Sequence, residues 1–186
     1  MVLRMRLPEI SRIIAIPVGV VVSIDGRKVT VRGSKATLTR DFSYAVAVSL
    51  MTDGKTVRIS SEWPRKKEAS LVGTINSHIQ NMITGVTKGY TYKLKIVFSH
   101  FPITVKVQNK AVLIENFTGE RRARSAKILG DVKVKLEPDD IIVQGSTLED
   151  VSQTAANIET VTKVTKKDPR VFLDGIYVFE RNEGMD

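Results

Sequence analysis

The sequence predicts an α+β fold of two tandem similar domains, each an antiparallel sheet with one packed helix, related by internal duplication. Short segments rich in Val, Ile and Thr are separated by turn signals, which is typical of antiparallel strands. Two longer segments space their apolar residues three or four positions apart, which is typical of helices. The order of these segments in the first half of the chain recurs in the second half.

The expected strands of the first half lie at residues 18–24, 29–31, 38–48 and 57–59. Asp25-Gly26 joins the first two, because this dipeptide supplies the positive φ angles that a two-residue turn needs. A helix is expected over residues 65–84, where apolar residues fall on one face. Pro64 fits the first turn of that helix, and the glycines that follow residue 84 are expected to end it.

The expected strands of the second half lie at residues 90–98, 102–107, 111–114, 132–136, 141–143 and 176–179. Ser146-Thr-Leu-Glu149 has the form of a capping box, in which the Ser146 hydroxyl accepts a backbone N–H and Glu149 reaches back. The helix that follows carries its apolar side chains on one side, at Leu148, Val151, Ala155, Ile158 and Val161.

The two halves can be aligned, and the difference in residue number between matched positions, the offset, changes only slightly along the chain. Pro17 matches Pro102 at an offset of 85, and the helix faces match at an offset near 79. Changes in turn length produce such drift, and a duplication explains the shared order. Two unrelated α+β domains of similar size would also look this alike. We expect an N-terminal α+β domain at 1–84, a linker at 85–89, and a C-terminal α+β domain at 90–186.

The composition indicates a folded chain with a polyanionic partner. Of the 186 residues, 42% are hydrophobic, which is too many for a disordered chain. The formal charge is +9, of which residues 1–89 contribute +8 and residues 90–186 contribute +1. Clustered Lys and Arg neutralise phosphates, although basicity alone is also compatible with a well-solvated surface. Aromatic residues make up only 6%, which argues against a base-stacking platform and favours recognition of backbone and shape.

The same composition excludes several kinds of active site. The chain has no Cys and only two His, His78 and His100, so thiolate zinc sites, disulfides and His-rich metal sites are excluded. It has neither a glycine-rich phosphate loop nor a nucleophile elbow. We therefore expect no catalytic residues, no metal, no cofactor and no enzymatic activity. Charged residues and Pro8 interrupt the apolar residues near the N-terminus before they can form a signal-peptide run. We therefore expect a cytoplasmic protein without a membrane anchor.

Three clusters of cations are candidate RNA-binding residues. They are Arg65, Lys66 and Lys67 at the start of the first helix; Arg121, Arg122 and Arg124 in a loop; and Lys163, Lys166, Lys167 and Arg170 at the exit of the second helix. Cations are disfavoured at a helix N-terminus and favoured at a C-terminus, so only the first cluster breaks a local rule. Solvated helix ends are the alternative interpretation of these clusters.

Several sequence motifs resemble the large-subunit ribosomal protein L6 family in its archaeal and eukaryotic branch. The motifs are Ser99-His-Phe-Pro-Ile103, Asn116-Phe-Thr-Gly-Glu120, Asp168-Pro-Arg-Val-Phe-Leu-Asp-Gly-Ile-Tyr-Val178, and strings within 17–42 and 73–90. They follow one another in the family's order over nearly the whole chain. The chain departs from the family at Ser34 and Ala36, where Pro and Gly are more usual, and it lacks the Lys-Gly-rich loop of bacterial members.

The resemblance implies two duplicated α+β domains and a structural role in the ribosome. It implies binding to 23S-type rRNA near the sarcin–ricin stem and the stalk base, where translation GTPases dock, beside neighbouring large-subunit ribosomal proteins. It also implies that the C-terminal domain makes most of the RNA contact, although the charge excess lies in the first half. The alternatives are a free nucleic-acid-binding regulator of similar fold and, less supported by the residues, a small hydrolase.

The two basic clusters of the second half are expected to form one RNA-binding surface. In a domain built from a sheet and one helix, the loop at the end of a strand and the segment that follows the helix can lie on the same edge. The loop with Arg121 would then lie beside the Lys163–Arg170 segment. Arg170 is expected to be the most specific contact, because the Asp168-Pro169 turn restricts its backbone. If this surface does not bind RNA, the expectation shifts to Arg65, Lys66 and Lys67.

Overall fold

The structure is a computed structural model that describes residues 8–99, 101–165, 167–168 and 170–185. It consists of two compact units, with the division between Thr87 and Lys88. Both units contain antiparallel sheets and one α-helix, which confirms the α+β class. Each unit has two small sheets, where the sequence predicts a single one.

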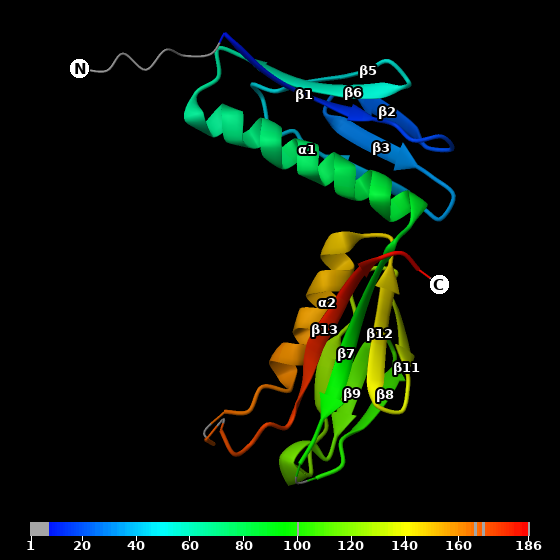
Figure 1. The fold of residues 1–186 in the computed structure, drawn as a ribbon, viewed down its shortest axis with the longest axis vertical. Helices are drawn as coiled ribbons and strands as arrows, with labels where there is room; N and C mark the ends of the chain where they lie inside the picture. The colour runs from blue at the N-terminus through cyan, green and yellow to red at the C-terminus, as the bar shows by residue number, and fades with distance from the viewer. Residues whose placement is uncertain (1–7, 100, 166, 169, 186) are drawn as a thin grey trace, which may run out of the picture. The chain divides into compact units, whose positions relative to one another are not determined.

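The first unit places one long helix against two three-stranded sheets (Figure 1). The strand orders are β1-β6-β5 and β2-β3-β4. Its elements are β1 (Glu9–Ala15), β2 (Val21–Asp25), β3 (Lys28–Arg32), β4 (Thr37–Asp41), β5 (Ser49–Thr52), β6 (Thr56–Glu62) and α1 (Lys66–Thr87). The strand expected over 38–48 is therefore shorter, because the chain turns after Asp41 and buries Phe42.

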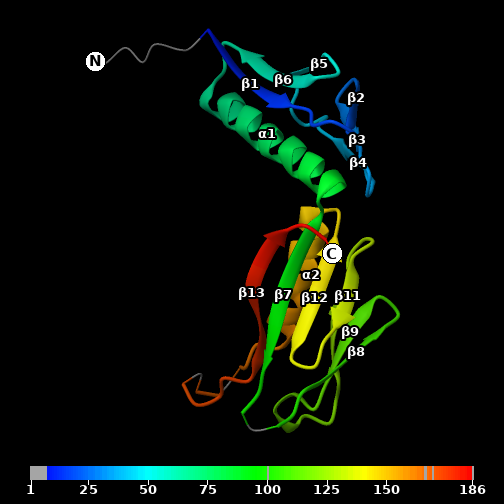
Figure 2. The same cartoon turned by 45° about the vertical axis from the view of Figure 1, so that its right-hand side comes forward.

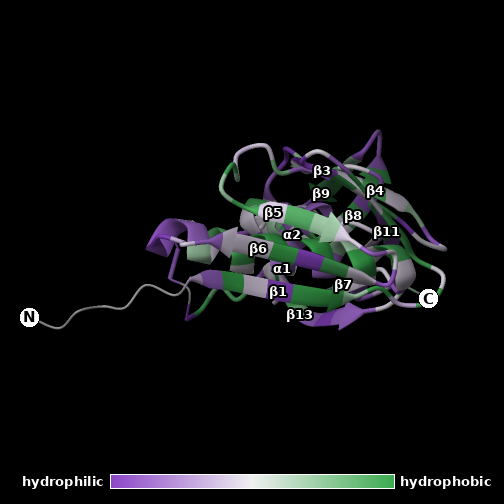
Figure 3. Cartoon of the chain, turned by 90° about the horizontal axis from the view of Figure 1, so that it is seen from above, coloured by the Kyte–Doolittle hydropathy of each residue, from purple (hydrophilic) through white to green (hydrophobic). Residues whose placement is uncertain are grey.

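The core of the first unit lies between α1 and the inner faces of its sheets. The helix contributes the residues that its periodicity predicts, among them Val72, Ile75 and Ile79, all fully buried. The strands contribute alternate residues such as Val29 and Val57. Along β1, β5 and β6 hydrophilic and hydrophobic residues are intermixed (Figure 3), as expected for strands with one buried face.

Helix α1 runs three residues beyond the expected end at residue 84. Gly85 lies inside the helix and is buried, so residues 85–87 belong to the helix and not to a linker. The last turn packs against Gly33, where an added Cβ would lie only 2.6 Å from a Val86 methyl carbon. The Lys35 amide also donates to the Val86 carbonyl oxygen at 3.1 Å. These tertiary contacts hold the final turn in place.

The second unit contains a four-stranded sheet, β11-β12-β7-β13, and a three-stranded sheet, β10-β9-β8 (Figure 2). Helix α2 packs against strands of both sheets. The elements are β7 (Tyr90–Val97), β8 (Thr104–Gln108), β9 (Ala111–Glu115), the 3₁₀ turn η1 (Phe117–Gly119), β10 (Arg124–Lys127), β11 (Lys133–Leu136), β12 (Asp140–Gly145), α2 (Leu148–Val161) and β13 (Gly175–Glu183).

The start of α2 differs from the sequence prediction by one residue. Thr147, not Ser146, is the N-cap, and its side chain makes no capping hydrogen bond. Glu149 and Asp150 occupy the first turn, where negative charge interacts favourably with the helix dipole. Negative charge in the first turn therefore stabilises the start of α2.

The two units share one topology, as a duplication requires. Sheet β1-β6-β5 corresponds to β7-β12-β11, sheet β2-β3-β4 corresponds to β8-β9-β10, and α1 corresponds to α2. One backbone hydrogen bond recurs at equivalent positions, from Ile16 to Lys55 at 2.8 Å and from Ile96 to Asp139 at 2.9 Å. This pair sets the offset between β1 and β7 at 80 residues. Strand β13 is the element without a counterpart in the described part of the first unit.

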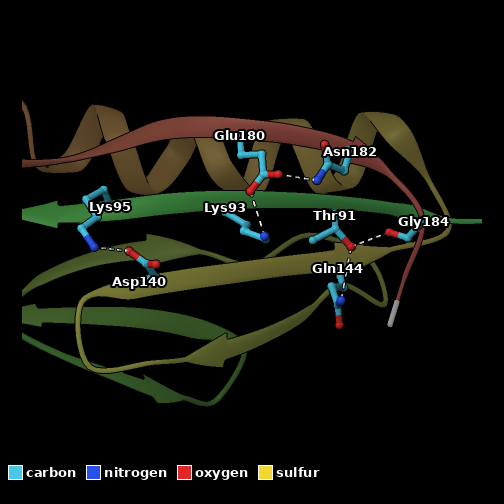
Figure 4. Close-up of polar contacts among 8 residues, drawn as sticks. All are labelled: Thr91, Lys93, Lys95, Asp140, Gln144, Glu180, Asn182 and Gly184. Atoms are coloured by element: carbon cyan, nitrogen blue, oxygen red, sulfur yellow. Dashed lines mark hydrogen bonds and ion pairs between the residues drawn. The ribbon is translucent and has the colours of Figure 1, made fainter.

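Strand β13 is attached to β7 by side chains as well as by its backbone (Figure 4). The Glu180 carboxylate forms an ion pair with the Lys93 ammonium at 2.8 Å. The Thr91 hydroxyl donates a hydrogen bond to the Gly184 carbonyl oxygen at 2.5 Å. Gln144 of β12 in turn donates to Thr91 at 3.2 Å. The register shifts between Val178 and Glu180, so a β-bulge accommodates the strand.

Candidate nucleic-acid interface

The candidate cations that the structure describes in the second unit lie in two segments, one around the start of β10 and one after the end of α2. All but one of them are exposed, and we call these the helix-exit surface: Arg121, Arg122, Lys163, Lys167 and Arg170. The arginines lie between η1 and β10, and the other residues lie in the segment between α2 and β13. Lys166 and Pro169 lie outside the described residues.

Arg124 is turned inward and joins the loop to the helix. Its Nη1 atom donates to the Val161 carbonyl oxygen at 2.7 Å and approaches that of Lys163 at 3.4 Å. Its Nε and Nη2 atoms donate to the two Glu120 carboxylate oxygens at 2.9 and 2.5 Å. The guanidinium carbon also lies 4.3 Å from the centre of the Phe117 ring. Arg124 is therefore a clamp within the protein.

The clamp places the two predicted clusters beside each other. The last carbonyl oxygens of a helix lack intrahelical partners, and a guanidinium there also interacts favourably with the helix dipole. The hydrogen bond from Arg124 lowers the pKa of Glu120 below its ordinary value, against the effect of desolvation; the charge of Arg124 and, more weakly, that of Lys167 act in the same direction. Glu120 thus interacts with cations from both clusters. The structure joins the loop of Arg121 to the end of α2 through the contacts of Arg124 with the Val161 and Lys163 carbonyl oxygens.

The loop that carries Arg121 and Arg122 has a tight backbone. Asn116, Thr118 and Gly119 all have positive φ angles, of 57°, 49° and 79°. The Asn116 side chain donates to the Pro102 carbonyl oxygen at 3.0 Å. Phe117 is buried beneath the Arg124 guanidinium. The Asn116-Phe-Thr-Gly-Glu120 motif therefore encodes a turn, a core anchor and the acceptor of the clamp.

The segment that carries Arg170 is also structured. The Asp168 side chain accepts the Arg170 backbone N–H at 2.9 Å, and the Asp168 carbonyl oxygen accepts that of Phe172 at 3.0 Å. The Lys167 ammonium lies 4.4 Å from the Phe172 ring centre. These contacts form a turn that presents the exposed Arg170 side chain to solvent.

Asp174 anchors this segment and was not identified from the sequence. It is 1% exposed and accepts the Ser99 backbone N–H at 2.7 Å. A carboxylate immediately before Gly175 and an apolar strand is the sequence signal that could have identified it, because such a position borders the sheet. Its role is to hold the loop end of β13 against the end of β7.

The third predicted cluster lies in the first unit. Arg65, Lys66 and Lys67 are all exposed at the start of α1. Glu68 reaches back to accept the Arg65 backbone N–H at 2.6 Å, and its charge offsets the unfavourable position of the cations. The cluster therefore has a local stabilising partner, and it belongs to a different unit from the helix-exit surface.

Within the described ranges, no group of three His, Asp or Glu side chains lies close enough to hold a metal ion. His78 lies on α1 with its ring centre 6.4 Å from that of the buried Phe42. His100 is outside the described residues. None of the helices in the described part of the chain is long and apolar enough to cross a membrane.

The comparison with known proteins agrees with the duplicated fold. The profile of the family described as Ribosomal protein L6 matches the chain twice, over residues 16–89 and 101–175. The chain belongs to the ribosomal protein L6 family. Each match covers most of one unit, which supports the duplication and confirms the resemblance seen in the sequence motifs.

Relatives in archaea match nearly end to end. Large ribosomal subunit protein uL6 of Desulfurococcus amylolyticus is 50% identical over 182 residues, covering 97% of this chain and 99% of the relative. The protein of the same name from Staphylothermus marinus is 51% identical over 181 residues, covering 96% and 98%. That of Methanosphaera stadtmanae is 47% identical over 179 residues, covering 96% and 97%. Membership in this family of ribosomal structural proteins confirms the expectation that the chain is not an enzyme.

Proposed function

We propose that this chain is a structural component of the large ribosomal subunit in the cytoplasm and binds 23S-type rRNA through the helix-exit surface. The bound RNA is the region near the sarcin–ricin stem and the stalk base. In that position the protein supports the site where translation GTPases dock, beside neighbouring large-subunit proteins. Family membership supports the ribosomal role, and the helix-exit surface supports the RNA contact.

The observation that carries this proposal is the clamp made by Arg124. By binding Glu120 and the Val161 carbonyl oxygen, it holds two loops of cations against one helix end. A surface with fixed cations loses less conformational entropy on binding than one with mobile loops. The other described cations of the helix-exit surface are exposed, so RNA phosphates can reach them.

The exposed cations have complementary roles in this proposal. Arg121 and Arg122 offer planar guanidinium forks, which match two phosphate oxygens at once. Lys163 and Lys167 act as point charges that attract the RNA backbone. Arg170 contributes a fork whose backbone is fixed by Asp168. Such contacts hold an RNA by its backbone and shape.

A salt titration of RNA binding tests the proposal. The full chain, Arg170→Ala and the Lys163→Ala/Lys167→Ala double variant are titrated with a sarcin–ricin stem fragment of 23S rRNA at several salt concentrations. Each phosphate contact removed is expected to lower the slope of log K against log salt by about 0.7–0.9. The slope for the double variant should therefore fall by about twice as much as the slope for Arg170→Ala.

The matched control is Lys133→Ala/Lys135→Ala, which removes the same charge from exposed positions on β11. It should leave the slope nearly unchanged. Unchanged slopes for Arg170→Ala and for Lys163→Ala/Lys167→Ala would refute the assignment and shift the proposed interface to Arg65, Lys66 and Lys67. Failure of the chain to co-sediment with large subunits in high salt would instead favour the free nucleic-acid-binding regulator.

A further inference from the structure

Strand β1 leaves one of its edges open. It pairs with β6 on one side, and within residues 8–99 no strand pairs with its other side. Figure 2 shows β1 at the border of its sheet, next to α1. An open edge presents a row of backbone N–H and C=O groups, which other extended segments can bind.

The backbone groups at this edge can be identified by their alternation. The Ile16 amide donates to Lys55, and the Pro8 carbonyl oxygen accepts from Trp63, so even-numbered residues of β1 bond to β6. In an antiparallel pair the intervening residues direct their backbone groups to the opposite side. The N–H and C=O groups at the open edge are therefore those of Glu9, Ser11, Ile13 and Ala15.

The second unit shows what occupies this position in the duplicated fold. With the offset of 80 residues, β1 corresponds to β7, and Ser11, Ile13 and Ala15 correspond to Thr91, Lys93 and Lys95. Strand β13 pairs with β7 at these positions, namely Asn182 with Thr91, Glu180 with Lys93 and Tyr177 with Lys95. The edge that β13 covers in one copy is paired with no strand among residues 8–99 of the other.

A groove runs along the open edge between β1 and α1. It has a volume of about 740 Å³, and its helix side is lined by Gly73, Asn76, Ser77, Gln80, Ile83 and Thr84. The equivalent groove of the second unit lies between β7 and α2, measures about 290 Å³, and is bordered by Val178 and Arg181 of β13. Both units therefore have a groove between the helix and the corresponding strand. In the second unit β13 borders this groove, and in the described part of the first unit no strand does.

The charges along the groove indicate the chemistry of the missing strand. Among the lining residues, Arg12 is charged, and none is Asp or Glu. Arg12 corresponds to Tyr92, which β13 covers with Arg181, whose guanidinium carbon lies 5.7 Å from the ring centre. A segment at the open edge would face a cation where β13 faces an aromatic ring. The complementary residue at that position is a carboxylate.

Two other occupants fit these charges less well. A second copy of this chain would bring a further Arg12 to the same edge, and each chain carries a charge of +9. RNA requires several cations, whereas Asn76, Ser77 and Gln80 line this groove with neutral side chains. Ile13, which is 67% exposed, adds apolar surface at the edge. An extended polypeptide uses both the backbone groups and this surface.

We propose that the open edge of β1 binds an extended, acidic segment of another protein, which pairs antiparallel to β1 as β13 pairs with β7 and directs a carboxylate to Arg12. The segment extends the three-stranded sheet to four strands. The first unit is then a protein-docking unit, and this inference does not depend on which surface binds RNA.

A peptide with the sequence of β13 and one substitution is the probe. It spans residues 175–183 and carries Arg181→Glu, so that its new carboxylate faces Arg12 in the register of β13. The peptide is titrated into the ¹⁵N-labelled full chain, and amide hydrogen exchange is measured. The amides of Ser11, Ile13 and Ala15 should become protected, whereas those of β5 at the other side of the sheet should not change.

Two variants of the chain make the test specific. Ser11→Pro removes an edge N–H, which an edge strand tolerates, and should abolish the protection. Arg12→Glu should weaken binding of the acidic peptide by about threefold or more and favour the unsubstituted peptide that retains Arg181. The control, Arg32→Glu, makes the same charge change on β3, outside the groove, and should bind like the unchanged chain.

Three results would overturn the proposal. The first is absence of protection at β1 with the peptide at millimolar concentration. The second is peptide binding that Arg12→Glu and Arg32→Glu affect equally, which would show general charge attraction. The third is protection of the same amides by an RNA fragment or by self-association of the chain, measured by sedimentation equilibrium, in place of the peptide.

Discussion

Replacing Arg124 by Ala should destabilise the second unit and leave the first unit unchanged. The substitution removes the hydrogen bond to the Val161 carbonyl oxygen, the paired contacts with Glu120 and the contact with the Phe117 ring. The Arg124 side chain is 25% exposed, so these interactions are only partly screened by solvent. The same change releases the Arg121 loop from the end of α2.

The expected magnitude follows from the three contacts. A hydrogen bond from a charged group contributes about 1.5 kcal/mol, the cation–π contact about 0.5 kcal/mol, and the partly exposed ion pair about 0.5 kcal/mol. Because the contacts share one side chain and are not independent, we expect a loss of about 2 kcal/mol. With a urea dependence of about 1–2 kcal/mol per molar, the midpoint of the second unit should fall by about 1–2 M.

The full chain contains an internal control for this measurement. Its one tryptophan, Trp63, lies in the first unit, so urea unfolding followed by tryptophan fluorescence reports that unit. Far-ultraviolet circular dichroism reports both units, and amide hydrogen exchange in α2 reports the second. The Arg124→Ala variant should shift the circular dichroism transition and the exchange of α2, with no change in the fluorescence midpoint.

The result that would refute the clamp is an unchanged stability of the second unit together with a reduced salt slope for RNA binding. Arg124 would then be a phosphate contact like its neighbours. Arg122→Ala is the matched variant, because it removes an exposed guanidinium from the same loop. It should reduce the salt slope without lowering the urea midpoint.

Three further outcomes are expected. Gly33→Ala should destabilise the first unit by about 1–3 kcal/mol in tryptophan-monitored urea unfolding, because its Cβ would lie 2.7 Å from the Val86 carbonyl oxygen and the backbone must shift. Gly73→Ala should stabilise the same unit by about 0.5–1 kcal/mol, since its Cβ meets no atom within 4 Å in a helix interior; a loss of stability would contradict this. Because Arg124 lowers the pKa of Glu120, the stabilisation is present above the ordinary value of 4.5 and is lost as the pH falls through the lower folded-state pKa. Urea midpoints of the second unit at about pH 6 and about pH 3 should differ less for Glu120→Gln than for the unchanged chain.

Periodicity predicted the helices well because burial follows the geometry of the helix. Val72, Ile75 and Ile79 recur at the spacing of one face, and each is fully buried. The helix end was harder to predict, because the last turn depends on Gly33, which is distant in sequence and leaves room for Val86. A local rule that ends helices at glycine does not include such a contact.

Strand β13 shows why the sheet could be predicted only in part. Residues 176–179 are apolar and predicted a strand, but Glu180 and Arg181 gave no such signal. The strand continues to Glu183 because β7 provides its hydrogen-bond partners and Lys93 provides a cation for Glu180. Pairing with a distant strand overrides local propensity here.

The candidate site was predicted as a set of cations, without their separate roles. Arg121, Arg122 and Arg124 are alike in the sequence and lie within four residues of one another. The structure distinguishes them, because Arg124 is turned toward Glu120 and the end of α2. Sequence charge identifies where cations accumulate, and tertiary contacts decide which of them remain available.

The pairing of β7 with β13 determines when each unit can be completed during synthesis. The first unit contains its whole core once Thr87 has left the exit tunnel. In the second unit, Tyr90 of β7 pairs with Glu183 of β13. Strand β7 is therefore synthesised first in this unit but cannot complete its pairing until β13, the last strand, has been synthesised. Contacts between such distant residues slow folding. The nascent chain therefore carries a finished domain ahead of one whose sheet still lacks an edge strand, and in that interval the β7 edge is exposed to chaperones and to mispairing.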